Sequence, residues 1–285
     1  MRTTICLLLI TTAALAEDLP VTRLAGVTIK VADLEKSRQF YTGMLGLDEA
    51  FTIKDSSGAL QSVFFKVNDD QYLEFSPGAA ENFQMEHVSL LTPDLKKAGA
   101  MLQKLGITPG RVAKSADGNS YFAIKEPDQP EIHCVRYMPG SKQTELRGKA
   151  LGPGRVSDHL QHVGLAADNE AASMALFRDK LGMRELFRGG PNPGEIRWIN
   201  MGMPGSPGDI VELMIMSAAP AQGRRHIAFE VADIQKAYKE LIRRGLPADR
   251  FKPNPGPKQN YRWILNLRDP NGFRVEFMGE AVTGQ

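Results

Sequence analysis

Cysteine and net charge are both scarce in this chain. Two of its 285 residues are cysteines, Cys6 and Cys134, and the formal net charge is +2. Cys6 falls in a segment that we expect to be removed, so Cys134 is left alone and an internal disulfide is excluded. We interpret Cys134 as a small buried residue and not as a nucleophile. The low charge excludes strong electrostatic attraction to nucleic acid or to an anionic membrane.

Long apolar runs are missing as well, except at the start. Arg2 precedes an apolar run from Ile5 to Leu15, and Ala14-Leu15-Ala16 has the small residues of a cleavage site. The run is too short to span a bilayer comfortably. The alternative, a buried first helix, fits poorly because the polar residue Glu17 follows at once. We therefore predict a signal peptide at residues 1–16 and a periplasmic or secreted protein without a membrane anchor.

What the sequence does contain is one pattern repeated four times. A β-like run leads into an amphipathic helix that starts at an Asp and stops at a Gly, and two or three β-like runs follow. Asp can accept hydrogen bonds from first-turn amides, and Gly can take the left-handed conformation that closes a helix. The predicted helices are Asp33 to Gly46, Asp94 to Gly106, Asp168 to Gly182 and Asp233 to Gly245. The chain is thus predicted to be an α+β protein of four βαβββ modules.

The four modules group into two pairs. Residues 139–158 are polar and Gly-rich, which is typical of a linker. Pro191-Asn192-Pro193-Gly194 and Pro253-Asn254-Pro255-Gly256 stand at matching places in the last two modules, which indicates an internal duplication. We therefore expect a first domain at residues 17–138 and a second domain at residues 159–285.

One His and one Glu recur at the same spacing in the last two modules. His162 lies in the first strand-like run of the third module and Glu212 in its last, and His226 and Glu276 take the same places in the fourth. The separation is 50 residues in both modules. Modules that fold alike would bring these four side chains around one divalent cation, and imidazole with carboxylate suits Zn, Ni, Co, Fe or Mn. We expect a five- or six-coordinate ion, because only then is there room for water beside four protein ligands.

Three motifs carry a resemblance to a known family. The segment from Asp269 to Glu276 is similar to the turn and ligand strand that end a module of the vicinal oxygen chelate superfamily. Leu45-Gly46-Leu47 and Leu181-Gly182-Met183 are similar to its helix-end phrase. This superfamily includes glyoxalase I, bleomycin-resistance proteins and extradiol dioxygenases, and the resemblance covers nearly all of the mature chain. It implies two cup-shaped mixed-sheet domains, with metal ligands at His162, Glu212, His226 and Glu276.

The first half departs from this ligand pattern. The equivalent positions hold Gly26, Glu74, His87 and His133, so one ligand is missing and one Glu has become His. We interpret this half as a domain without an intact metal site. The alternative is a second site of two histidines and one carboxylate, which suits non-haem iron. His159, just before the third-module strand, is expected to be solvated.

Arginine, tryptophan and tyrosine also recur near the expected cup. Arg197 and Arg262 stand at matching places and are candidates for bidentate contacts to an anionic substrate. A place as solvated edge-strand residues is an equal alternative. Trp198 and Trp263 are expected in the core. Tyr261 is a candidate hydrogen-bond donor near the cup.

The resemblance implies a reaction class and leaves alternatives. A Lewis-acid metal would bind two adjacent oxygens of a small substrate, and Glu212 or Glu276 would move a proton as general base, as in glyoxalase-type lyases and isomerases. The first alternative is an extradiol dioxygenase with iron on His162, His226 and Glu276. The second is a non-catalytic binding protein of the bleomycin-resistance type. The expected partner is a small molecule, and the chain is expected to be a monomer or a homodimer.

Overall fold

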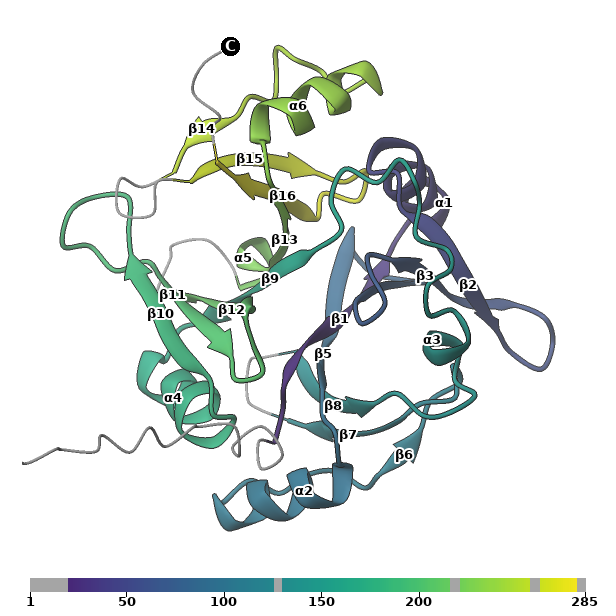
Figure 1. The fold of residues 1–285 in the computed structure, drawn as a ribbon, viewed down its shortest axis with the longest axis vertical. Coiled ribbons are helices and arrows are strands. Elements are labelled where there is room, and N and C mark those ends of the chain that lie inside the picture. Colours follow the sequence, from purple (N-terminus) through teal and green to yellow (C-terminus); the bar gives the residue numbers. More distant parts are fainter. Residues whose placement is uncertain (1–19, 126–129, 216–220, 257–261, 281–285) are drawn as a thin grey trace, which may run out of the picture.

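The computed structural model describes residues 20–125, 130–215, 221–256 and 262–280. The expected signal peptide and Tyr261 lie outside these ranges. The described chain forms two curled sheets of eight strands each, which confirms the predicted paired-module fold (Figure 1). Within the described ranges, no helix is long and apolar enough to cross a membrane.

The first sheet has the strand order β2-β3-β4-β1-β5-β8-β7-β6, and the second has the order β10-β11-β12-β9-β13-β16-β15-β14. The strands of the first sheet are β1 (Arg23–Val31), β2 (Asp48–Lys54), β3 (Leu60–Lys66), β4 (Tyr72–Pro77), β5 (Phe83–Leu91), β6 (Ala113–Lys114), β7 (Ser120–Ile124) and β8 (Glu131–Arg136). Those of the second are β9 (Leu160–Ala167), β10 (Arg184–Gly189), β11 (Trp198–Met203), β12 (Ser206–Ile215), β13 (His226–Val231), β14 (Asn254–Pro255), β15 (Trp263–Arg268) and β16 (Arg274–Gly279).

Each sheet is made of two modules joined at their first strands. The first strands pair antiparallel at the centre, β1 with β5 and β9 with β13. Each first strand also pairs in parallel with the last strand of its own module, as β9 does with β12 and β13 with β16. The first and last strands, which hold the predicted ligands, therefore lie side by side in the middle of the sheet.

One helix crosses over in each module. These are α1 (Leu34–Gln39), α2 (Leu95–Lys104), α4 (Glu170–Met174) and α6 (Ile234–Arg243), and short helices α3 (Lys142–Glu145) and α5 (Ala221–Arg224) lie between modules. π-helical segments at Phe40–Met44 and Ala175–Lys180 extend α1 and α4. Three predicted N-caps are right, but in α4 the cap is Asn169 and not Asp168. Asp168 instead pairs with Arg224 at 2.7 Å.

Strand periodicity separates the core from the cup. On β16, Val275 and Phe277 are buried on the face that packs in the core, and Glu276 points to the opposite face. Cys134 is fully buried, and burial raises the pKa of its thiol to about 12, as expected for a packing residue. The two tryptophans differ from the prediction. Trp198 and Trp263 are only half-buried, although Trp263 does pack against the core.

Candidate metal centre

The four predicted ligands come from the four central strands of the second sheet. His226 on β13 lies opposite Gly164 on β9, and His162 lies opposite Ala228. In the parallel pairs, Glu212 is level with Gly164 and Glu276 with Ala228. Residues two apart on a strand share a face, so all four side chains point into the same cup.

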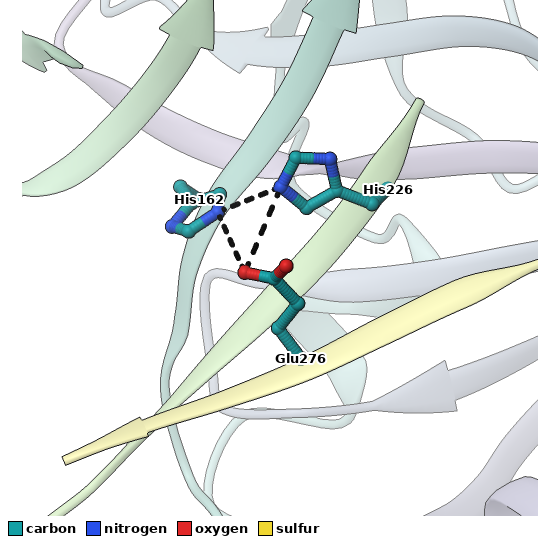
Figure 2. Close-up of side chains that lie close together, drawn as sticks. All are labelled: His162, His226 and Glu276. Carbon is teal, nitrogen blue, oxygen red and sulfur yellow. Dashed lines mark hydrogen bonds and ion pairs between the residues drawn. The ribbon is translucent and has the colours of Figure 1, made fainter. Parts of the chain in front are cut away.

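The structure brings these four side chains together. His162 Nε2 lies 3.0 Å from His226 Nε2 and 3.8 Å from Glu276 Oε2, and Figure 2 shows the three side chains pointing at one another. Glu212 Oε2 lies 3.1 Å from His226 Nε2 and 3.9 Å from His162 Nε2. All four are at most 9% exposed. Buried charged groups of this kind are normally paired or bind a metal.

The histidines are held with their Nε2 atoms toward the centre. His226 Nδ1 lies 2.9 Å from the carbonyl oxygen of Arg224, and His162 Nδ1 lies 3.2 Å from Gln161 Oε1. Both outer partners are acceptors, so each Nδ1 donates its proton and each neutral ring keeps a bare lone pair on Nε2. The two imidazole lone pairs and the two carboxylates then converge without a hydrogen-bond donor between them. Imidazole nitrogen and carboxylate oxygen are ligands that suit a divalent cation.

The protonation states agree with this reading. Burial lowers the pKa of His162 to about 4. Burial alone would raise the pKa of Glu212, but the positive charge that His162 and His226 carry when they are protonated at low pH outweighs it, and the pKa falls to about 2. Neutral imidazole and ionised carboxylate are the forms that bind a metal.

Comparisons with known proteins identify a family for this chain. The model of the Glyoxalase/Bleomycin resistance protein/Dioxygenase superfamily matches residues 23–132 and 159–277. The chain belongs to this superfamily. A search of curated proteins gave no match.

Solved structures share the fold of this superfamily member at low sequence identity. The 2,3-dioxygenase LapB from Pseudomonas sp. KL28 is 16% identical with a TM-score of 0.65, over 94% of this chain and 95% of that one. The Mn(II)-bound glyoxalase from Novosphingobium aromaticivorans is 15% identical with a TM-score of 0.65, over 91% and 82%. An extradiol ring-cleaving dioxygenase from B. fuscum is 19% identical with a TM-score of 0.67, over 94% and 74%.

An arginine and an asparagine that the sequence pattern does not single out lie beside the two glutamates in the cup. Arg274 Nε lies 2.7 Å from Glu276 Oε1 and 3.1 Å from Asn266 Oδ1, so it holds the outer oxygen of Glu276. The sequence does hold a signal for Arg274, because it stands two residues before Glu276 on the same strand and residues two apart on a strand share a face. Asn200 lies opposite Glu212 as Asn266 lies opposite Glu276. Its Oδ1 is buried without a hydrogen-bond partner among the described residues.

The two predicted substrate arginines contact carboxylates of their own domain. Arg197 is exposed and pairs with Glu195, and Arg262 Nη2 lies 2.8 Å from Glu230 Oε1. Both arginines therefore pair with a carboxylate, but the two partners stand at different places in their modules. A role for either arginine in holding an anionic substrate stays a prediction.

The first domain of this superfamily member has a different set of side chains at the ligand positions. A Cβ at Gly26, where φ is +150°, would lie 1.8 Å from the carbonyl oxygen of Tyr72, so a histidine cannot replace it without backbone movement. Thr28 takes the place that Gly164 has in the second domain, and its Oγ1 lies 2.7 Å from both Glu74 Oε2 and His87 Nε2. Among the described residues, the three ligand atoms that gather within 4.8 Å are those of His162, His226 and Glu276. Glu74, His87 and His133 do not gather in this way.

Gly164 makes room for one of the ligands. A Cβ at this position would lie 1.9 Å from Cε1 of the His226 ring. We expect Gly164→Ala to push the ring aside and to weaken metal affinity by about 10- to 100-fold, as when a ligand loses its support. Titration with zinc in competition with a chelator measures this. Gly43→Ala is the control, because a Cβ there meets nothing within 4 Å. Unchanged affinity in Gly164→Ala would contradict the assigned position of His226.

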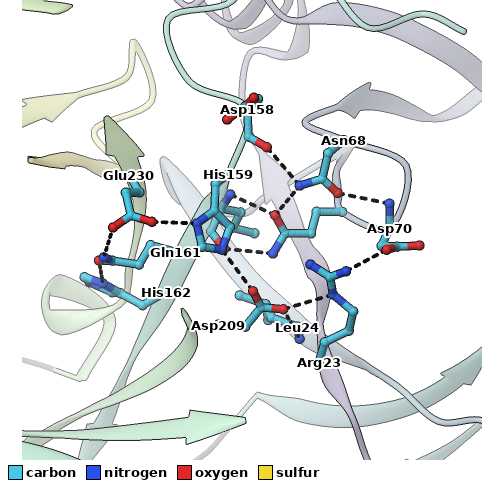
Figure 3. A network of polar contacts seen from close by, with 12 residues as sticks. Arg23, Leu24, Asn68, Asp70, Asp158, His159, Gln161, His162, Asp209 and Glu230 are labelled. Carbon is cyan, nitrogen blue, oxygen red and sulfur yellow. Dashed lines mark hydrogen bonds and ion pairs between the residues drawn. The ribbon is translucent and has the colours of Figure 1, made fainter. Parts of the chain in front are cut away.

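A polar network joins the two domains close to this site, and it corrects the prediction that His159 is solvated. His159 lies 2.9 Å from Asp209 and 2.9 Å from Glu230, and its side chain is 23% exposed (Figure 3). Asp209 also binds Arg23 of the first domain at 3.1 Å. Glu230 continues the network to Gln161, which contacts His162.

This network predicts a pH-dependent stability. Hydrogen bonds to Asp209 and Glu230 raise the pKa of His159 from 6.5 to about 9. A raised pKa gives stability that is complete below pH 6.5 and is lost as pH rises through 9. With a chelator present, we expect His159→Asn to lower the free energy of unfolding by about 2 kcal/mol at pH 6 and by much less at pH 10. Urea unfolding at the two pH values measures the difference in free energy of unfolding between the wild type and the variant. A difference that is larger at pH 10 than at pH 6 would contradict the prediction.

Proposed function

We propose that this chain is an exported, metal-dependent enzyme with glyoxalase-type lyase or isomerase chemistry on a small substrate that carries two adjacent oxygens. One observation carries the choice of chemistry. Glu212 Oε2 lies 3.1 Å from His226 Nε2, beside the group of His162, His226 and Glu276, and we take it as the fourth ligand. A six-coordinate ion with four protein ligands has two places left, which two substrate oxygens fill. The chain shares its fold with the Mn(II)-bound glyoxalase and equally with ring-cleaving dioxygenases, so the choice between them rests on the ligands and not on the fold.

The metal would supply a Lewis acid that stabilises negative charge on the substrate oxygens. The two glutamates then have different roles. Arg274 holds Glu276 through Oε1, so this carboxylate is fixed in place. Glu212 contacts the two imidazoles and lies beside Asn200, which leaves it the freer of the two to take a proton from the substrate carbon. Asn200 Oδ1, which has no partner among the described residues, is placed to accept a hydrogen bond from a substrate hydroxyl group.

Extradiol ring cleavage is the second candidate. The observation that favours it is the triad itself, because His162, His226 and Glu276 are the set whose ligand atoms all lie within 4.8 Å in the described chain. Two histidines with one carboxylate suit non-haem iron that activates oxygen. Two observations count against ring cleavage. Glu212 would occupy the coordination position that O₂ needs. The sequence from residue 181 to residue 225 holds no histidine that could act as acid and base.

Paired assays with and without oxygen distinguish the two candidates. The metal-loaded protein is given 2-oxoaldehydes, hydroxy-carbonyl compounds and catechols, and solvent deuterium exchange at the substrate carbon is followed together with product formation. The proposal expects exchange and turnover of a carbonyl substrate at equal rates in both atmospheres. Ring cleavage of a catechol that consumes O₂ and requires iron would reverse the order of the candidates.

Export remains a proposal that rests on the sequence of residues 1–16. The expected mature protein from the native host begins at or near Glu17 and lies in the periplasmic or secreted fraction. Mass spectrometry of the purified protein gives its first residue. An intact chain from Met1 in a cytosolic fraction would contradict export.

A further inference from the structure

The first domain holds a cavity where the second domain holds its metal ligands. The cavity has a volume of about 490 Å³, which lies in the range of about 300–1,000 Å³ that small-molecule sites have. Residues of β1, β3, β4, β5, β7 and β8 line it. Among them are the equivalents of the metal ligands, Gly26, Glu74, His87 and His133. The cup of this domain has therefore kept its hollow without the metal geometry.

One carboxylate of this cup has no cationic partner in the described chain. Glu74 is level with Thr28, as Glu212 is level with Gly164 in the other cup, and its side chain lines the cavity. Its Oε2 accepts a hydrogen bond of 2.7 Å from Thr28 Oγ1. No lysine or arginine among the described residues forms an ion pair with it. The contacts of Glu74 with the protein are therefore those of a charged group with neutral hydroxyls.

Carboxylates just outside the cavity do have cationic partners. Glu86 lies 2.9 Å from Lys30 Nζ, and Glu131 lies 2.8 Å from Lys125 Nζ. Glu74 differs from both, and burial raises its pKa because the carboxylate loses water without gaining a positive charge. Charged groups that are withdrawn from water are normally paired. A cationic ligand in the cavity would supply the missing partner.

The rest of the lining adds negative charge and neutral rings. Asp117 also lines the cavity, and its charge raises the pKa of Glu74 further. Lys114 belongs to the lining too, but its side chain is exposed. His87 and His133 are neutral at neutral pH, because burial lowers the pKa of both, and that of His87 falls to about 3. In the described part of the lining, two carboxylates thus face one lysine, which leaves the cavity with net negative charge.

Rings form another part of the cavity wall. The His87 and His133 rings stack at 3.8 Å with an angle of 16°, and Tyr121 stacks on His133 at 4.5 Å with an angle of 22°. Phe64, which also lines the cavity, stacks on Phe51 at 4.4 Å. Ring faces of this kind pack well against a planar ring, and the faces of Tyr and Phe attract a positive charge.

We propose that this cavity binds a positively charged aromatic molecule, namely a planar ring that carries a protonated amidine or amine group. The cationic group pairs with Glu74, and the ring packs against the rings of the wall. The site is separate from the metal centre and does not depend on the reaction of the second domain. It gives the first domain a ligand-binding role in place of a purely supporting one.

Calorimetric titration of the full-length protein with benzamidine tests the proposal, and benzamide is the matched neutral ligand. The two molecules have nearly the same planar shape, but only benzamidine is charged at neutral pH. We expect one benzamidine site per chain and an affinity for benzamide that is at least about tenfold lower, because hydrogen bonds between charged groups are stronger than neutral ones. Glu74→Gln keeps the shape of the side chain and removes its charge, so this variant should lose the preference for benzamidine.

Two control variants should bind benzamidine like the wild type. Glu49→Gln removes a carboxylate of the first domain that pairs with Arg38 and does not line the cavity. The double variant His226→Ala with Glu276→Ala changes only the other cup. Thermal unfolding of each variant shows whether it is folded. If Glu74→Gln does not fold, Ser89→Leu takes its place, and it should abolish binding of both ligands because Ser89 lines the cavity and a larger side chain fills it.

Three results would overturn the proposal. The first is absence of benzamidine binding by the wild type. The second is equal affinity of the wild type for benzamidine and benzamide, or a preference for benzamidine that persists in Glu74→Gln, since either would show that Glu74 does not recognise the cation. The third is loss of benzamidine binding in the double variant, which would place the ligand in the second domain.

Discussion

Replacing His226 by alanine is expected to remove the metal almost completely. This residue is fully buried, its ring fits against Gly164, and its Nε2 lies within 3.8 Å of a ligand atom of each of the other three residues. Loss of the hydrogen-bond partner of a ligand side chain lowers metal affinity by about 10- to 100-fold. Loss of the ligand itself should therefore lower metal affinity by more than about 100-fold. Elemental analysis should show about one divalent ion per wild-type chain and less than about one tenth of an ion in the variant. Glu276→Ala should behave in the same way.

The first domain offers the matched control. His87 pairs with Thr28 on the neighbouring strand just as His226 pairs with Gly164. His87→Ala should therefore keep the full metal content, and so should His133→Ala. Full occupancy in His226→Ala, or loss of the ion in His87→Ala, would mean that the ion binds elsewhere.

Replacing Glu212 by glutamine should abolish turnover of a 2-oxoaldehyde or hydroxy-carbonyl substrate. The amide keeps an oxygen near His226 but cannot accept the substrate proton, and loss of a general base typically costs about 10²- to 10⁴-fold in rate. Exchange of the substrate carbon proton with solvent deuterium should stop together with turnover. Kinetic assays of the metal-loaded variant, with and without oxygen, measure both effects.

Glu170→Gln is the control for this change, because Glu170 lies on α4 outside the cup and pairs with Arg188. It should leave the rate unchanged. Oxygen-dependent cleavage of a catechol that persists in Glu212→Gln would show that Glu212 is not needed and that the triad of His162, His226 and Glu276 carries an extradiol reaction.

The fold could be predicted because its signals are local and repeated. Helix period, a capping Asp and a closing Gly recur in each module, and the spacing of 50 residues between His162 and Glu212 matches that between His226 and Glu276. A repeat of this kind places its copies at equivalent strand positions, so the meeting of the four side chains follows from the pattern. The N-cap of α4 shows where local signals stop being sufficient. Asp168 and Asn169 are adjacent and either can cap the helix, but Asp168 pairs with Arg224, so Asn169 is the cap.

The remaining features depend on contacts between distant segments. The sequence predicts that His159 is solvated, but Asp209 and Glu230 contact it on both sides, and no residue near His159 in the sequence points to either carboxylate. The need for glycine at position 164 appears only once the register of β9 with β13 is known. Thr28, which binds both Glu74 and His87, likewise depends on the pairing of three strands.

The most direct test is a crystal structure of the metal-loaded protein with anomalous diffraction at the absorption edge of the bound ion. One ion per chain should lie in the cup of the second domain, with ligand atoms from β9, β12, β13 and β16, namely His162, Glu212, His226 and Glu276. An ion held by His162, His226 and Glu276 with Glu212 turned away would contradict the four-ligand site and the reaction proposed for it. An ion in the first domain would contradict the account of both domains.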